Sequence, residues 1–145
     1  MKVTGYRGQV SVKADGMPPG RSSIRSHRDL IVWQKAMDLV DVVYDLVDHF
    51  PQRENYGLWT QITRAVTSVP ANIAEGHARS TRNDFANFLA MARGSLMEAD
   101  TLLGVAVRRR YIAESDAEKV AGRIEEISKM LTSLRSKLAP RRGAS

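Results

Sequence analysis

Residues 80–110 read STRNDFANFLAMARGSLMEADTLLGVAVRRR, and the spacing of their apolar and small side chains predicts one long helix. The positions on one face alternate by three and four residues: Phe85, Phe88, Ala92, Ser95, Ala99, Leu102 and Ala106. This period is that of an amphipathic α-helix. Ser80 or Thr81 is expected to cap the start of the helix, and Asp84 follows in the first turn, where a negative charge is favourable.

A second face of the same helix also carries little charge. Its members are Ala86, Ala90, Met97 and Gly104. A helix that is apolar on two faces is buried on two sides, and the core of a single four-helix bundle covers only one of them. We therefore predict that these four residues form an interface between copies of the chain, since small side chains let a neighbouring helix approach closely.

Two segments before this helix also have helical periodicity. Residues 29–50 carry an apolar stripe with four aspartates on the opposite face, and Pro51 ends the segment because the residue before a proline avoids helical geometry. Residues 54–79 contain Pro70 in their middle. Because the apolar stripe keeps its phase across this proline, we expect one kinked helix rather than two helices.

A last segment, residues 115–138, alternates apolar positions by four and three residues. Ser115 and Glu118 have the spacing of a capping box, in which each side chain accepts a hydrogen bond from the backbone of the other. Four helices with short connections and no competing strand pattern predict an all-α protein. The expected architecture is an antiparallel up-down four-helix bundle.

The 145-residue chain divides by composition into a folded body and two basic tails. We expect residues 1–27 to be disordered, residues 28–138 to form the bundle, and residues 139–145 to form a second tail. The net charge of +6 belongs to the tails, because residues 1–28 carry +5 and residues 29–138 carry −1. A basic tail suits nucleic acid or an acidic partner, although a solvated leader has the same composition.

What the sequence lacks excludes several classes of protein. The absence of cysteine excludes disulfides and thiolate metal sites, and it suits a cytoplasmic location. No apolar run reaches the length of a membrane helix. None of the three histidines belongs to the Glu-x-x-His pair of metal-binding bundles, and no phosphate-binding glycine loop or serine-nucleophile motif is present. We therefore expect no metal, no cofactor and no enzymatic activity.

A polar stripe runs beside the apolar stripe of the second helix. It consists of Gln61, Arg64, Ser68, Asn72 and Glu75. If this arc is buried, its charges need partners, and the third helix offers Arg93, Ser95 and Glu98. We predict a polar network that fixes the register of the bundle. A site for a ligand or a partner is the alternative.

The third helix ends in the run Arg108-Arg109-Arg110. Two interpretations are open. On the first, the three cations only stabilise the C-terminus of the helix, where positive charge is favoured by the helix dipole. On the other, they form a phosphate-contacting surface together with Arg79, Arg82 and Arg123. No aromatic residue lies within the run. We therefore expect any nucleic-acid binding to be directed at the backbone of the nucleic acid and weakly specific for sequence.

Several motifs match a known family. They are DLIVWQKA at 29–36, FP at 50–51, Glu54-x-Tyr56-Gly57-Leu58, QITRAVTSVPANIAEG at 61–76 and ARGSLME at 92–98. In these motifs, which lie within residues 28–138, the chain resembles the four-helix-bundle proteins encoded in intervening sequences of ribosomal RNA.

The resemblance implies an up-down four-helix bundle that assembles as a ring, typically a homopentamer, and it implies no catalytic activity. One similar branch is the accessory variability protein of diversity-generating retroelements, a basic pentameric barrel that binds a reverse transcriptase and nucleic acid. The resemblance thus leads us to expect a homo-oligomeric adaptor for RNA, DNA or a nucleic-acid enzyme such as a reverse transcriptase. The folded body here is slightly acidic, unlike that branch, so a protein-binding scaffold with no nucleic-acid role is the alternative.

Overall fold

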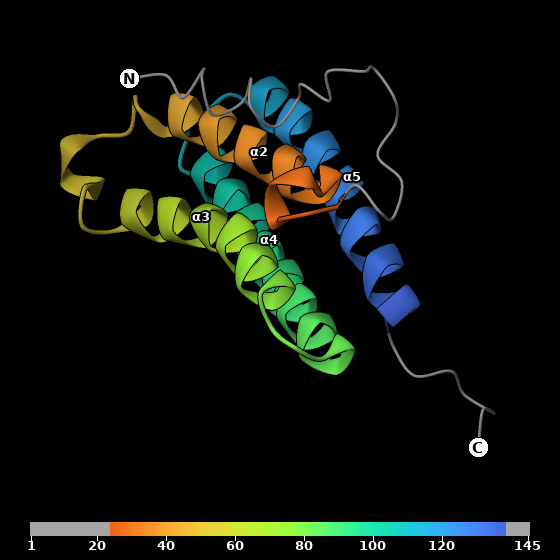
Figure 1. Cartoon of the computed structure of the whole chain (residues 1–145). Coiled ribbons are helices and arrows are strands. Elements are labelled where there is room, and N and C mark those ends of the chain that lie inside the picture. The colour runs from red at the N-terminus through yellow and green to blue at the C-terminus, as the bar shows by residue number, and fades with distance from the viewer. Residues whose placement is uncertain (1–23, 139–145) are drawn as a thin grey trace.

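The computed structural model describes residues 24–138, which form four α-helices and two short 3-10 turns (Figure 1). The helices are α2 (Ile31–Val47), α3 (Leu58–His77), α4 (Arg82–Arg108) and α5 (Glu114–Leu138), and the turns are η2 (His27–Asp29) and η3 (Gln52–Glu54). No strand occurs in this part of the chain, so the predicted all-α class with four helices is confirmed. None of these helices has both the length and the apolar character needed to cross a membrane.

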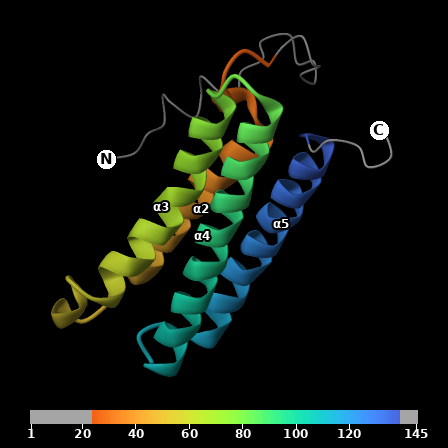
Figure 2. The ribbon, with the colours of Figure 1, turned by 90° about the horizontal axis from the view of Figure 1, so that it is seen from below.

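The four helices enclose one core. α3 and α4 share the most extensive contact, α5 packs against α4 and α2, and α2 packs against α3 (Figure 2). Each helix contributes large side chains that are fully buried, among them Leu39, Ile62, Leu96 and Ile127. Burying an aliphatic side chain of this size contributes about 1.5–3 kcal/mol, so the core holds the helices together.

The buried face of α4 differs from the predicted one. The buried positions are Ala86, Leu89, Ala92, Leu96, Ala99, Leu103 and Ala106, whereas Phe85, Phe88, Ser95 and Leu102 are only partly buried. α4 contacts α3 on one side and α5 on the other, so its buried arc is centred between the two neighbours. Ala86, predicted to face another copy of the chain, is therefore covered by this chain's own core.

The described chain begins slightly before the predicted boundary at residue 28. The Ser26 hydroxyl accepts a hydrogen bond from the Arg28 N–H at 3.2 Å, and the Asp29 carboxylate accepts from the Ser26 N–H at 3.3 Å. This capping box forms η2, and the His27 ring packs edge-on against Trp33. The remainder of the two predicted tails, residues 1–23 and 139–145, lies outside the described residues.

Pro70 lies inside one continuous helix, α3, as predicted from the unbroken apolar stripe. This helix begins at Leu58 rather than near Glu54, because the Glu54 carboxylate accepts a hydrogen bond from the Leu58 N–H at 3.1 Å and thereby satisfies a free donor of the first turn.

The capping box predicted at the start of the last helix is wrong. α5 begins at Glu114, so Ser115 already lies within its first turn. The N–H groups of Asp116 and Ala117 both donate to the carbonyl oxygen of Ala113, at 3.2 and 3.1 Å. Ala113 therefore occupies the capping position, and a hydroxyl one residue beyond the helix start has no such role.

Gly76 permits a close approach between α3 and α4. A Cβ atom added to Gly76 would lie 2.5 Å from the Cβ of Phe88 and 3.0 Å from the ring of Phe85. Because the Cβ of Phe88 is bonded directly to the backbone of α4, it cannot move aside as the end of a flexible side chain would. The absence of a side chain at Gly76 thus sets the separation of the two helices.

We predict that Gly76→Ala lowers the free energy of unfolding by about 1–3 kcal/mol, the usual cost of overpacking, as measured by urea denaturation. Gly94→Ala is the matched control, since no atom lies within 4 Å of a Cβ added at that helical position. Alanine favours a helix over glycine by about 1 kcal/mol, so the control should be neutral or stabilised. Equal effects of the two substitutions would contradict the close approach at Gly76.

Candidate functional site

Three members of the predicted polar network meet between α3 and α4. The hydroxyl oxygens of Ser68 and Ser95 lie 2.9 Å apart, and the Asn72 amide donates to the hydroxyl and the carbonyl oxygen of Ser68, both at 2.9 Å. Within residues 24–138, every buried side-chain nitrogen and oxygen has a hydrogen-bond partner. The cluster is therefore satisfied without a ligand, which favours the prediction that it fixes the register of the two helices.

The other members of that network do not join the cluster. The exposed ones are Gln61, Arg64, Glu75, Arg93 and Glu98. Arg93 turns instead to α5, where its Nε donates to the Ser128 hydroxyl at 3.1 Å. Sequence reasoning missed Ser128, because the polar faces of α5 do not indicate which of their residues faces α4.

The predicted phosphate-contacting arginines do not form one surface. Arg79 lies in the connection before α4 and Arg82 begins this helix, whereas Arg108 is its last residue and Arg109 and Arg110 follow it. A helix of this length spans about 40 Å, so the two groups occupy opposite ends of the bundle. Arg123 lies apart from both groups, on α5.

The first group of arginines joins helices to one another. Arg79 forms an ion pair with Glu75 at 3.1 Å, and its guanidinium lies 4.8 Å from the centre of the Phe88 ring. Arg82 donates to the carbonyl oxygen of Lys137 at 2.6 Å, which ties α4 to the last turn of α5. Both side chains thus have structural partners within the bundle.

The second group, Arg108 to Arg110, forms the C-terminal end of α4, which has an unusual backbone conformation. The N–H of Arg110 donates to the carbonyl of Val107, and the N–H of Tyr111 donates to that of Ala106, both at 2.9 Å. This is the pattern of a Schellman motif, whose left-handed position is usually glycine. Arg110 occupies that position with a φ of 63°, and it is the only non-glycine residue among those described with a positive φ.

Glu54 connects this end of α4 to the start of α3. One carboxylate oxygen of Glu54 accepts from the Leu58 N–H, and the other accepts from the Tyr111 hydroxyl at 2.8 Å. These two hydrogen bonds, with smaller contributions from nearby Arg53 and Arg109, hold the pKa of Glu54 below its usual value. No local sequence pattern indicates this contact, because it joins residues 57 positions apart.

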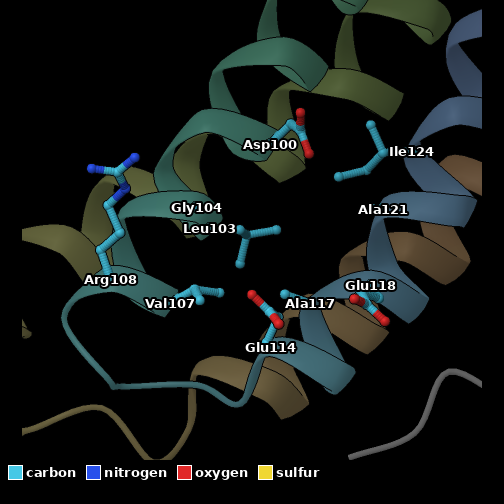
Figure 3. A pocket seen from close by; sticks show the side chains of 10 residues that line it. All are labelled: Asp100, Leu103, Gly104, Val107, Arg108, Glu114, Ala117, Glu118, Ala121 and Ile124. Atoms are coloured by element: carbon cyan, nitrogen blue, oxygen red, sulfur yellow. The ribbon is translucent and has the colours of Figure 1, made fainter.

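A groove between α4 and α5 contains two of the four residues predicted to contact another copy of the chain. It holds two hollows of about 370 and 790 Å³, with Gly104 lining the first and Met97 the second. Figure 3 shows the first hollow, with Leu103 and Val107 on its α4 wall and the carboxylates of Asp100, Glu114 and Glu118 around it. The predicted residue Ala90 lines neither hollow and is half-buried.

Among residues 24–138, no group of three or more histidine, aspartate or glutamate side chains is placed to hold a metal ion. These residues display cations and apolar surface.

We predict that Glu54 stabilises the fold in a pH-dependent manner. Because its pKa is lowered in the folded state, its contribution is complete above the pKa of an unfolded glutamate and is lost as the pH falls through the lowered value. The difference in unfolding free energy between wild type and Glu54→Gln should be constant above about pH 5 and shrink below about pH 4. Tyr111→Phe removes one of the two hydrogen bonds and should show a smaller change of the same sign. A difference that does not depend on pH would contradict this role.

Comparison with known proteins agrees with the motifs noted in the sequence. Residues 28–133 match the model of the 23S rRNA-intervening sequence protein family. A solved structure, a protein of unknown function from the S23 ribosomal protein family of Bacteroides thetaiotaomicron, is 27% identical. Its match has a TM-score of 0.67 and covers 72% of this chain and 98% of that one. No curated protein matches the chain. Since the family model covers nearly all of the four helices, the chain belongs to the 23S rRNA-intervening sequence protein family.

Proposed function

We propose that the chain is a non-enzymatic, cytoplasmic adaptor that binds nucleic acid through the arginines at the end of α4 and acts as an up-down subunit of a homo-oligomeric ring. The observation that carries this proposal is the conformation of Arg110. A left-handed backbone costs a residue with a side chain about 1–2 kcal/mol, and glycine adopts it readily. Strain of this kind is concentrated at functional sites, so an arginine here favours a role for its charge.

The charges near Arg110 support phosphate binding. Arg108, Arg109 and Arg110 are all exposed, as is Arg53. Within residues 24–138 none of these four arginines forms an ion pair. The acidic side chains Glu114, Asp116 and Glu118 at the start of α5 weaken the field at longer range. Binding therefore depends on direct contacts with a few phosphates.

We predict that replacing Arg108, Arg109 and Arg110 together with glutamine weakens binding to RNA or DNA about 10- to 100-fold. Four cations release about four counterions, so the slope of log affinity against log salt should be about −3 to −4 and should fall in the variant. Because the helix-dipole contribution is about 0.3–1 kcal/mol, the variant should stay folded. Fluorescence anisotropy at several salt concentrations measures both quantities.

The matched control replaces three exposed cations of α5 that line neither hollow, Lys119, Arg135 and Lys137, with glutamine and so removes the same net charge. This control should retain most of the affinity. A chain that lacks residues 1–23 tests the basic N-terminal tail. If that deletion abolishes binding and the arginine variant binds normally, the tail is the binding element and the site at α4 is wrong.

The groove between α4 and α5 supports self-association. We propose that a helix of a second copy fills this groove, in a ring of five subunits as the resemblance implies. Gly104 has no atom within 4 Å of an added Cβ, and Ala121 is exposed and lines both hollows. Small side chains on both walls let a helix approach closely. Leu103 and Ile124 provide an apolar floor, since both are buried between the walls.

We predict that the wild type is larger in solution than the 16.1 kDa monomer and that Ala121→Arg reduces it to a monomer, as measured by light scattering. The arginine would fill the groove without entering the core, so the thermal unfolding of the bundle should be little changed. Gly122→Arg is the matched control, because Gly122 is exposed on α5 but lines neither hollow. A monomeric wild type at micromolar concentration would contradict the assembly.

A protein-binding scaffold is the second candidate. Asp45 and Asp48 are exposed on α2, which favours a basic protein partner over a nucleic acid on that side of the bundle. A nucleic-acid enzyme such as a reverse transcriptase is the partner that the resemblance implies. If the wild type binds no nucleic acid at any salt concentration, the scaffold is the better proposal.

A further inference from the structure

Tyr56 is the most exposed large hydrophobic side chain among the described residues. It is 99% exposed, in the short loop between η3 and α3. The other tyrosines of residues 24–138 pack against neighbouring rings: Tyr44 lies edge-on to Trp59, and Tyr111 lies 5.2 Å from Phe50. An aromatic ring left wholly in water gains nothing from folding, so its position calls for a contact outside the bundle.

The loop that carries Tyr56 is held in place on both sides. Before it, the Asn55 N–H donates to the carbonyl of Gln52 at 3.1 Å, and the Thr60 hydroxyl donates to the carbonyl of Asn55. After it, the Gly57 N–H donates to the carbonyl of Glu54 at 3.0 Å. These bonds fix the backbone around Tyr56, so a contact with its ring has to order only the two torsions of the side chain.

Tyr56 lies at the same end of the bundle as the exposed arginines. Glu54, two residues before Tyr56, accepts a hydrogen bond at 2.8 Å from the hydroxyl of Tyr111, the residue that follows Arg110. Arg53 and Arg109 also help to lower the pKa of Glu54, which agrees with this arrangement. Figure 2 shows the loop before α3 and the connection between α4 and α5 at one end of the molecule. The fold thus brings the loop that carries Tyr56 to the end of the bundle where the exposed arginines lie.

We propose that Tyr56 stacks on an unpaired base while the neighbouring arginines contact phosphates, so that the site prefers single-stranded RNA or DNA to duplex. This inference rests on the proposed nucleic-acid function and specifies its ligand. Aromatic rings bind bases through their flat faces, which stacking hides in a duplex and exposes in a single strand. Because every base has such a face, stacking adds affinity without adding sequence specificity.

The test compares a fluorescently labelled single-stranded oligonucleotide with the duplex of the same sequence, using full-length wild type, Tyr56→Ala and Tyr56→Phe. Tyr56→Ala should weaken single-strand binding about 5- to 100-fold, the range found for the loss of one stacked base, and should leave duplex binding unchanged. Tyr56→Phe keeps the ring and should restore single-strand binding. The side chain is exposed, so neither substitution should alter thermal unfolding.

The outcomes separate this inference from the proposed function. If Tyr56→Ala binds the single strand as well as wild type does, while the Arg108–Arg110 glutamine variant loses it, the arginine site stands and stacking at Tyr56 is wrong. If Tyr56→Ala dissociates the oligomer in light scattering, Tyr56 is a subunit contact and the inference is overturned. If wild type binds neither oligonucleotide, the function and this inference fail together.

Discussion

The separation of α3 and α4 at Gly76 is the constraint on which the rest of the bundle depends. Any side chain at Gly76 would collide with the backbone-bonded Cβ of Phe88. With the helices this close, the Ser68 and Ser95 hydroxyls reach hydrogen-bond distance further along the same contact. Arg79 then reaches over Phe88 and closes the end of the interface. These contacts set the register of α4, and α4 in turn positions the groove with α5 and the arginines at its own end.

The number and type of the helices could be predicted from the sequence, because a stripe of apolar residues every 3.6 positions has one simple explanation. The continuity of α3 through Pro70 was predictable for the same reason. The buried arc of α4 was not, since Leu89, Leu96 and Leu103 are buried only because α4 has neighbours on two sides. The capping residue of α5 was not predicted correctly. Ser115 and Glu118 have the spacing of a capping box, but the helix begins one residue earlier, at Glu114, and the local sequence does not show this shift.

The candidate site was predictable only in part. Features formed by neighbouring residues were visible in the sequence, and contacts between residues far apart in the chain were not. The run from Arg108 to Arg110 is visible as a run, but its left-handed member and its separation from Arg79 appear only in three dimensions. The contact between Glu54 and Tyr111 joins two loops that no local pattern connects. The exposure of Tyr56 was not predictable either, because the local sequence does not show whether the ring of a loop tyrosine packs inward or points to solvent.

Arg108 belongs to two surfaces at once, and this has a thermodynamic consequence. Its side chain lines the hollow between α4 and α5, and it also begins the arginine run at the end of the bundle (Figure 3). Whatever fills the hollow changes the surroundings of Arg108, and therefore changes the free energy with which its charge meets an anion. By linkage, an anion held at Arg108 must change the affinity of the groove for its occupant by the same factor. On the proposed function, assembly and ligand binding would therefore be coupled equilibria that share the Arg108 guanidinium.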